Sequence, residues 1–277
     1  MKKIFCPTDF TVASHAAFQH ALSLTLAHKG NLIIMHVPTD ADDKHGFPGV
    51  RDQLTKWCLL GEGSSKETLS HLGIDVEKVV GRTGDPVDIV LHYLDHKPVD
   101  LVVLSTHQRE GRSRWLGRAI AEPLARGSHA MTLFLPQGLG GFVSPKDGSL
   151  NLKRILIPIS RHPSPQPAVT AAIQLLSTCG VSGATITLLY VGDAPDMPAV
   201  DTTTHYTVLG MTQEIRSGEP VEKILEVAEE IDADLVVMST AGHHGFLDAL
   251  RGSTTERVLR KLSCPLLAVP INKKEES

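Results

Sequence analysis

The stretch Asp100-Leu-Val-Val-Leu-Ser-Thr106 returns later in the chain as Asp234-Leu-Val-Val-Met-Ser-Thr240. The two copies lie 134 positions apart, and the same offset relates Gly84-Asp-Pro-Val to Gly218-Glu-Pro-Val. An offset that stays constant from Gly84 to Thr106 indicates an internal repeat, in which each copy forms one structural unit. The chain is therefore expected to contain two copies of the same fold.

Each half presents the same order of elements, with short runs of Val, Ile and Leu alternating with stretches of helical spacing. Strands are expected at 3–7, 31–37 and 131–135 in the first half, and at 154–158, 184–191 and 265–269 in the second. Helices are expected at 14–28 and 168–178, and again from Pro86 and Pro220, because proline suits the first turn of a helix. This pattern predicts an α/β fold: two repeated doubly wound, Rossmann-like domains, each with a mostly parallel five-stranded sheet and helices on both faces.

The repeat also predicts the domain boundaries. The first domain is expected at 1–137 and the second at 152–272, with a Gly-, Ser- and Pro-rich linker at 138–151 and a polar tail at 273–277. The first half carries twenty extra residues between Val37 and Gly84, with a helix expected over 51–71. The matching interval of the second half, 193–205, is full of helix breakers, so its second helix is expected to be shortened or lost. The sheet face left open there would be covered by this loop, by the other half of the chain or by another chain, which would then be an unknown protein partner.

Composition narrows the class of protein. Of the 277 residues 42% are hydrophobic and 21% charged, and the formal net charge is −4, which gives no basic surface for nucleic acid or an anionic membrane. None of the four cysteines forms a Cys-x-x-Cys motif, a usage typical of a reducing compartment. No signal peptide or membrane-length apolar run is present, so the expected location is the cytoplasm.

The loop after the repeated strand of the second half is the candidate ligand site. In open parallel sheets ligands bind beyond the carboxyl ends of the strands. This loop contains Gly242 and Gly252, and Ser253 with Glu256 makes a capping box at the start of a helix. Free backbone N–H groups at such a start favour a phosphate. An ordinary loop that enters an ordinary helix has the same features, so this reading stays open.

The order of elements, the Ile-Pro of the first strand at Pro158, the Gly-x-Pro before the third helix and the Leu-Val-Val-Met-Ser-Thr strand resemble the universal stress protein family. The resemblance covers nearly the whole chain, twice over. It implies two fused domains that pack as a pseudo-dimer, in which the final strands at 131–135 and 265–269 could pair with each other, and a homodimer stays one further option. It also implies ATP binding through a Gly-x2-Gly-x9-Gly-Ser/Thr loop, an aspartate after the first strand and a valine that ends the second.

The two halves match that pattern differently. In the second half the resemblance assigns ATP to Ser160, Val191, Ser239, Gly242, Gly252, Ser253 and Thr254, with serine in place of the aspartate. In the first half Asp9 and Val37 are present, but Gln108 and Arg118 replace the two later glycines. Backbone amides dominate the anchoring of a triphosphate, so ATP, with or without Mg²⁺, is expected in the second half.

The function implied is a stress-response regulator that binds ATP and is non-catalytic or at most a weak ATPase. No catalytic triad, nucleophile elbow or P-loop lysine appears. Two alternatives stay open: a nucleotide-independent interaction scaffold, and an enzyme of the related α-hydrolase type. His243 and His244 do not have the spacing of a zinc site, so no metal centre is expected. The arginines of segment 109–118 are read as a solvated loop or as an anion-binding surface.

Overall fold

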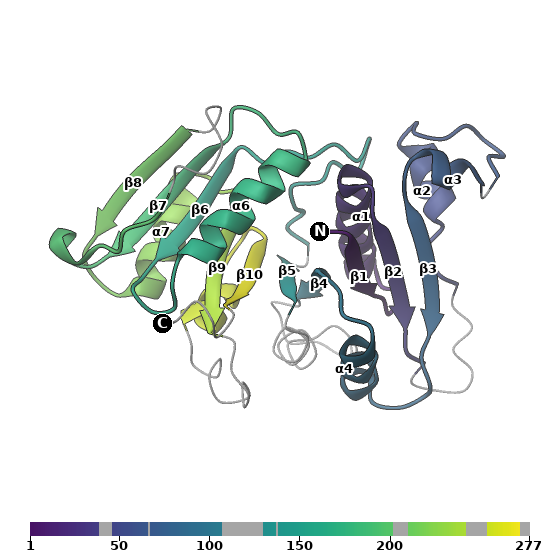
Figure 1. The fold of residues 1–277 in the computed structure, drawn as a ribbon, viewed down its shortest axis with the longest axis horizontal. Coiled ribbons are helices and arrows are strands. Elements are labelled where there is room, and N and C mark those ends of the chain that lie inside the picture. Colours follow the sequence, from purple (N-terminus) through teal and green to yellow (C-terminus); the bar gives the residue numbers. More distant parts are fainter. Residues whose placement is uncertain are drawn as a thin grey trace. The chain divides into compact units, whose positions relative to one another are not determined.

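A computed structural model describes residues 1–38, 46–65, 67–106, 130–136, 138–201, 210–241 and 254–271. The chain divides into two compact units, Met1–Leu150 and Asn151–Ser277 (Figure 1). The predicted glycine loop at 242–253, the histidine pair within it and the arginine-rich segment 109–118 lie outside the described residues.

The first unit is a doubly wound α/β sheet. Its elements are β1 (Lys3–Pro7), α1 (Val12–His28), β2 (Asn31–His36), α2 (Val50–Lys56), α3 (Glu67–His71), β3 (Asp75–Val80), α4 (Pro86–His96), β4 (Leu101–Thr106) and β5 (Met131–Pro136). The strand order is β3-β2-β1-β4-β5, with all pairs parallel. The connection from β1 to β2 through α1 and the connection from β3 to β4 through α4 run in opposite directions along the sheet. Because such connections are right-handed, α1 and α4 lie on opposite faces of the sheet.

The second unit repeats this order. Its elements are β6 (Arg154–Ile159), α6 (Gln166–Thr178), β7 (Thr185–Val191), the 3₁₀ turn η1 (Ala194–Asp196), β8 (Gly210–Arg216), α7 (Pro220–Glu230), β9 (Leu235–Ala241), α8 (Thr254–Leu259) and β10 (Leu266–Ile271). The strand order is β10-β9-β6-β7-β8, again parallel throughout. The predicted fold of two five-stranded, doubly wound halves is confirmed.

The aspartate that opens each repeated stretch has the same structural role in both units. Asp100 Oδ2 accepts hydrogen bonds from the backbone N–H groups of Lys2 and Lys3, at 2.5 and 2.9 Å. Asp234 Oδ2 accepts from Lys153 and Arg154 in the same way, both at 2.8 Å. Each carboxylate therefore ties the start of one central strand to the start of its neighbour. Partial burial opposes ionisation of Asp100, but these N–H donors outweigh it and lower the pKa of its carboxyl.

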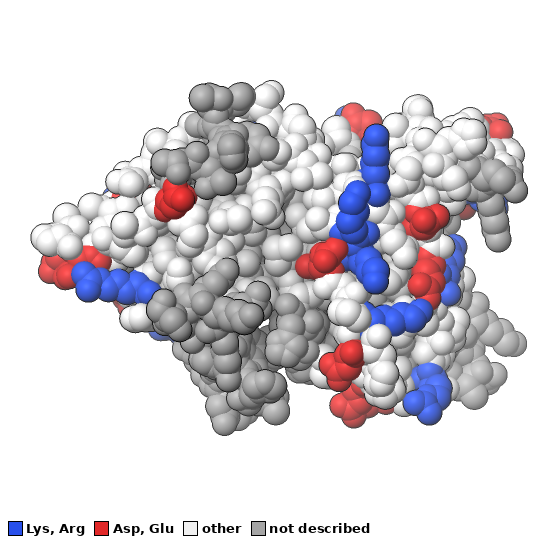
Figure 2. Space-filling model, in the orientation of Figure 1, with Lys and Arg blue, Asp and Glu red and all other residues white. Residues whose placement is uncertain are grey.

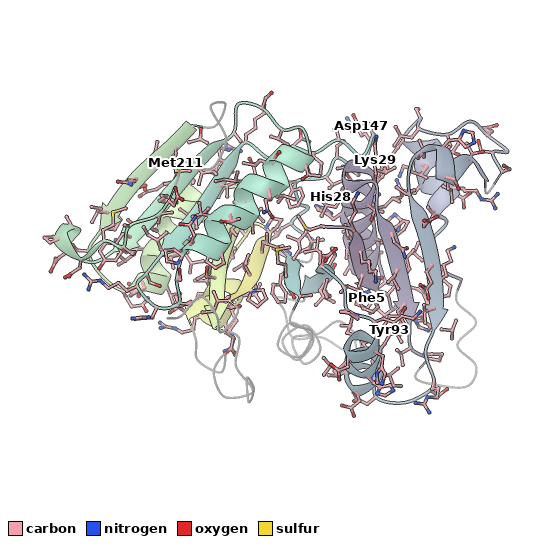
Figure 3. All side chains as sticks on the ribbon, in the orientation of Figure 1. Phe5, His28, Lys29, Tyr93, Asp147 and Met211 are labelled. Carbon is pink, nitrogen blue, oxygen red and sulfur yellow. The ribbon has the colours of Figure 1, made fainter. Side chains whose placement is uncertain are left out.

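Helices α4 and α7 begin as the Gly-x-Pro motif predicts. Proline occupies their first turn, where its missing N–H costs nothing. The preceding acidic residues cap the turn: Asp85 accepts from the N–H groups of Val87 and Asp88, and Glu219 accepts from Glu222. Helix α4 then packs on the sheet through Tyr93, whose ring lies 5.8 Å from that of Phe5 in β1 (Figure 3).

The segment predicted as a linker packs against the first unit. Helix α1 is buried almost all round, and residues 138–150 contact it at His20 and Ser23. Phe142 stacks edge-on against His20, and the Ser23 hydroxyl donates to the Gly148 carbonyl at 2.8 Å. The Trp57 indole N–H donates to Pro145 at 3.3 Å. This segment is therefore a structural cover of α1 as well as a connection.

The region between the second and third strands differs from the prediction in one half. Instead of one helix over 51–71, the first unit has the two short helices α2 and α3, separated by a turn that contains Gly61 and Gly63. In the second unit, the described residues between β7 and β8 hold only η1. Arg161 and Gln166 fasten that stretch: the Arg161 guanidinium pairs with Asp196, and the Gln166 amide pairs with the backbone of Asp201.

Charged side chains are interspersed on the surface. On the face shown in Figure 2, Lys and Arg lie beside Asp and Glu. One ion pair of the first unit joins Lys97 and Glu77, at 2.9 Å. Within the described ranges, no helix combines the length and apolar character needed to cross a membrane. The same ranges bring together no group of three or more metal-binding side chains.

Candidate functional site

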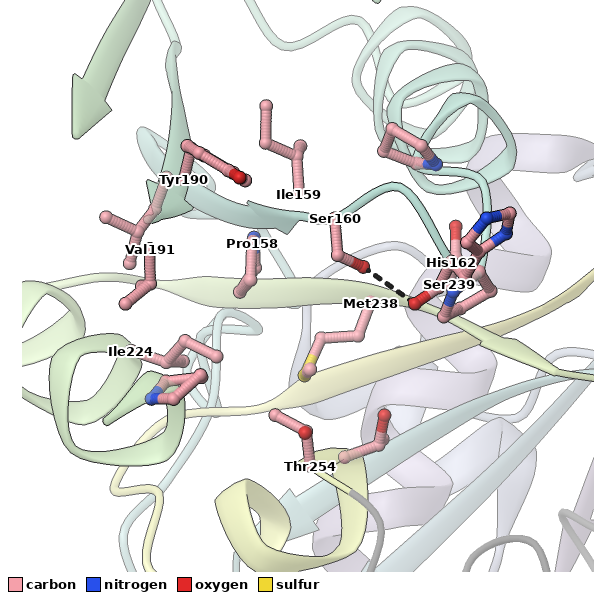
Figure 4. A pocket seen from close by; sticks show the side chains of 15 residues that line it. Pro158, Ile159, Ser160, His162, Tyr190, Val191, Ile224, Met238, Ser239 and Thr254 are labelled. Atoms are coloured by element: carbon pink, nitrogen blue, oxygen red, sulfur yellow. Dashed lines mark hydrogen bonds between the residues drawn. The ribbon is translucent and has the colours of Figure 1, made fainter. Parts of the chain in front are cut away.

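A cavity of about 210 Å³ opens in the second unit at the carboxyl ends of β6, β7 and β9 (Figure 4). Strand β6 has β7 on one side and β9 on the other, so the chain order reverses there. The crevice at such a reversal is where open α/β sheets bind ligands. Its described lining comprises Pro158, Ile159, Ser160, His162, Pro163, Pro165, Leu189, Tyr190, Val191, Pro220, Ile224, Met238, Ser239, Thr254 and Thr255.

The cavity brings together four of the residues predicted for the second half. Ser160 follows β6, Val191 ends β7, Ser239 belongs to β9, and Thr254 begins α8. The predicted glycines and Ser253 occupy the chain between β9 and α8, outside the described residues. Both ends of the predicted loop, Ser239 and Thr254, therefore border one cavity.

Two serine hydroxyls give the cavity complementary polar groups. Ser160 Oγ donates to the carbonyl of His162 at 3.1 Å, which leaves its lone pairs to accept a hydrogen bond from a ligand. Ser239 Oγ accepts from the N–H of Ala168 at 3.3 Å, so its own hydrogen can be donated. The second of these bonds also joins β9 to the first turn of α6, which fixes the Ser239 side chain.

Helix α8 is held beside the cavity by ion pairs. Arg257 contacts Glu219 at 2.9 Å, and Glu219 in turn caps α7. The buried carboxylate of Glu256 pairs with Arg260. No Asp, Glu, Lys or Arg occurs in the described lining, which is mostly proline and aliphatic. The described part of the cavity therefore suits an uncharged, partly apolar group with a few hydrogen-bonding atoms.

Sequence reasoning did not single out several lining residues, above all Tyr190, Met238 and Ile224. Tyr190 immediately precedes the predicted Val191, and Met238 precedes Ser239. Consecutive residues of a strand point to opposite faces of the sheet, but at the end of the strand both can line a cavity that lies beyond the edge of the sheet. The neighbour of each predicted residue is therefore also a candidate lining residue.

The equivalent carboxyl ends of β1 and β2 in the first unit are surrounded by different side chains. Asp9 Oδ1 accepts hydrogen bonds from the N–H and the hydroxyl of Thr11, at 3.1 and 2.6 Å. Its Oδ2 is buried without a hydrogen-bond partner. Val37 directly follows β2 and is fully buried. Phe10 lies against His36, with ring centroids 4.2 Å apart. The two residues predicted here are thus near an aromatic pair that the chain itself supplies.

The fold defines a tandem, doubly wound α/β protein with a cavity at the chain reversal of its second unit. The chain belongs to the universal stress protein family, whose model matches residues 1–136 and 208–270. A universal stress protein E homolog of Haemophilus influenzae is 48% identical over 62 residues, which are 22% of this chain and 20% of that protein. The chain thus matches about a fifth of that relative's length.

A solved structure supports the fold over the whole length of the chain. A universal stress protein from Archaeoglobus fulgidus aligns with a TM-score of 0.62 at 17% identity, covering 99% of this chain and 97% of that one. A family protein from Arabidopsis thaliana, solved with AMP bound, covers 45% of this chain and is itself covered to 95%, with a TM-score of 0.29 and 17% identity. The first of these supports the two-unit architecture over the whole length.

Proposed function

We propose that the second unit binds an adenine nucleotide, ATP, as a regulatory ligand in a stress-response protein. The observation that carries the proposal is the cavity that joins Ser160, Val191, Ser239 and Thr254 at the chain reversal. Its volume of about 210 Å³ is below the range of about 300–1,000 Å³ typical of whole drug-sized ligands. It therefore suits the nucleoside, with the phosphates extending past Ser239 and Thr254, the described residues nearest in the chain to the predicted glycine loop.

The chemistry of the lining fits a nucleoside. The amino group and the ribose hydroxyls of adenosine can donate hydrogen bonds, and the Ser160 hydroxyl oxygen can accept one of them. The ring nitrogens of the base accept hydrogen bonds, and the Ser239 hydroxyl can donate one. The aliphatic and proline side chains offer apolar contact to the base. A magnesium ion would be held mainly by the phosphates and water, as this ion usually is.

We infer that the ligand is bound rather than consumed. Efficient hydrolysis needs a group that positions water and charges that stabilise the transferring phosphate. The sequence carries no P-loop lysine, catalytic triad or nucleophile elbow that would supply them. A phosphate-release assay with the purified protein is expected to show turnover far below that of ordinary ATPases, and steady release at about 1 s⁻¹ or more would contradict the inference.

Titration of ATP into wild type and Gly252→Arg tests the site. The substitution imitates Arg118, which holds the equivalent position in the first half, and should abolish measurable heat. Gly61→Arg is the matched control, because a side chain at Gly61 meets only the Ser64 hydroxyl at 3.9 Å and lies in the other unit. This variant should bind ATP as wild type does.

Two outcomes would overturn the proposal. If wild type shows neither heat nor a thermal shift at millimolar ATP, and releases no adenine when denatured, the scaffold function is favoured instead. If Asp9→Ala weakens ATP binding more than Gly252→Arg does, the ligand binds in the first unit and the assignment of the half is wrong.

A further inference from the structure

The aromatic residue at the end of the second strand occupies the same position in both units. In the first unit β1 and β2 pair with Pro7 beside Met35, and in the second β6 and β7 pair with Pro158 beside Leu189. The next residues along these strands are His36 and Tyr190. Each ring therefore stands at the carboxyl edge of its sheet, next to the strand that ends at the chain reversal.

The first unit shows what lies against a ring at this position. Phe10 comes three residues after Pro7, and its ring centroid lies 4.2 Å from that of His36 with the planes tilted by 36°. Phe47 then meets Phe10 edge-on at 5.9 Å. Phe10 adopts a φ of 62°, in the left-handed region that residues other than glycine seldom occupy. The backbone thus takes an unfavoured conformation that sets an aromatic ring on His36.

Among the described residues of the second unit, no aromatic ring is paired with Tyr190 in this way. The residue three positions after Pro158 is Arg161, and its guanidinium is held by Asp196, with Nη2 2.8 Å from the carboxylate and Nε 3.1 Å from the backbone carbonyl. Tyr190 instead lines the cavity, and its side chain extends toward Ile159 and Ser160 (Figure 4). Gly192 allows this placement, because a Cβ there would come within 2.8 Å of the Tyr190 hydroxyl oxygen.

We propose that Tyr190 is the stacking platform for the base of the bound nucleotide, and that Phe10 is the internal counterpart of that base in the first unit. This inference rests on the proposed function. A planar ring is the occupant that the equivalent position accepts in the first unit, and the cavity beside Tyr190 has the uncharged, apolar lining that a base requires. The first unit retains Asp9 and Val37 but places its own side chain where a base would lie.

Calorimetric titration of the full-length protein with ATP and with AMP tests the platform. Tyr190→Leu should weaken both nucleotides by about tenfold, within the range measured for loss of a base–aromatic stack. The factor should be the same for both, because the contact is with the base and not with the phosphates. Tyr190→Phe keeps the ring and should bind within about threefold of wild type. Unfolding curves without ligand show whether each variant is folded.

A second pair of variants tests the internal counterpart. Arg161→Phe places in the second unit the residue that Phe10 supplies in the first, and should weaken ATP at least about tenfold by covering Tyr190. Arg161→Ala removes the same ion pair with Asp196 without adding a ring, and should bind ATP as wild type does. Equal weakening by both Arg161 variants would overturn the inference.

The failures are distinguishable. If wild type binds neither ATP nor AMP, the proposed function fails and the platform with it. If wild type binds them and Tyr190→Leu binds them equally well, or loses affinity for ATP alone, the nucleotide site stands and only the role of Tyr190 is refuted.

Discussion

Replacing Asp234 with alanine should destabilise the second unit by about 2–4 kcal/mol. The carboxylate accepts two backbone N–H bonds at 2.8 Å, from Lys153 and Arg154, and a third bond from the Arg154 guanidinium at 3.1 Å. A hydrogen bond to a charged group contributes about 1.5–3 kcal/mol, and water that enters at the exposed rim recovers part of the loss. The Asp234 side chain is only 19% exposed, so that recovery is limited.

Asp232→Asn is the matched control, because Asp232 has a φ of 49° and asparagine tolerates this left-handed conformation while it removes the charge. Asp232 also pairs with Arg154, at 2.8 Å, but its side chain is 84% exposed. An exposed ion pair contributes about 0–1 kcal/mol, so this variant should unfold close to wild type. Urea unfolding followed by circular dichroism compares the two, and a biphasic curve is expected because two units need not unfold together. Equal effects of the two substitutions would refute the reasoning.

Two further predictions concern the cover of α1. Burial lowers the pKa of His20 to about 4, and the hydrogen bond of its ring to the Ala16 carbonyl opposes this shift only in part. The folded state therefore keeps the ring neutral, whereas the unfolded state takes up a proton below about pH 6.5. Stability should therefore fall by up to about 3 kcal/mol as the pH drops from about 6.5 to 4, and His20→Gln should flatten that dependence in urea unfolding at several pH values; parallel wild-type and variant profiles would contradict it. Gly148→Ala should loosen residues 138–150, because φ is +72° and a Cβ would lie 2.6 Å from the Trp57 ring, whereas Gly140→Ala has the same φ and meets nothing within 4 Å. Gly148→Ala alone should shift the fluorescence of Trp57 to the red, and a shift of equal size in both variants would show that backbone strain, not the indole contact, is responsible.

The order of elements and the direction of every described strand pair could be predicted because their causes are local. Apolar runs of strand length alternate with helical spacing, and the 134-residue offset from Asp100 to Asp234 transfers each assignment to the other half. The capped starts at Pro86 and Pro220 follow from residues next to them in the chain. In contrast, residues 138–150 resemble a linker because of their glycines, serines and Pro145, and their contacts with His20, Ser23 and Trp57 join positions that are far apart in sequence.

For the site, the sequence by itself determined where to look: the carboxyl ends of β6, β7 and β9, marked by Ser160, Val191 and Ser239. Only the tertiary structure decided what fills the corresponding places in the two units. A pattern of residue types shows which strand ends meet, but the side chains that lie there depend on packing across the fold. Phe10 turns onto His36 in the first unit, whereas Arg161 turns to Asp196 in the second and leaves Tyr190 on the wall of a cavity.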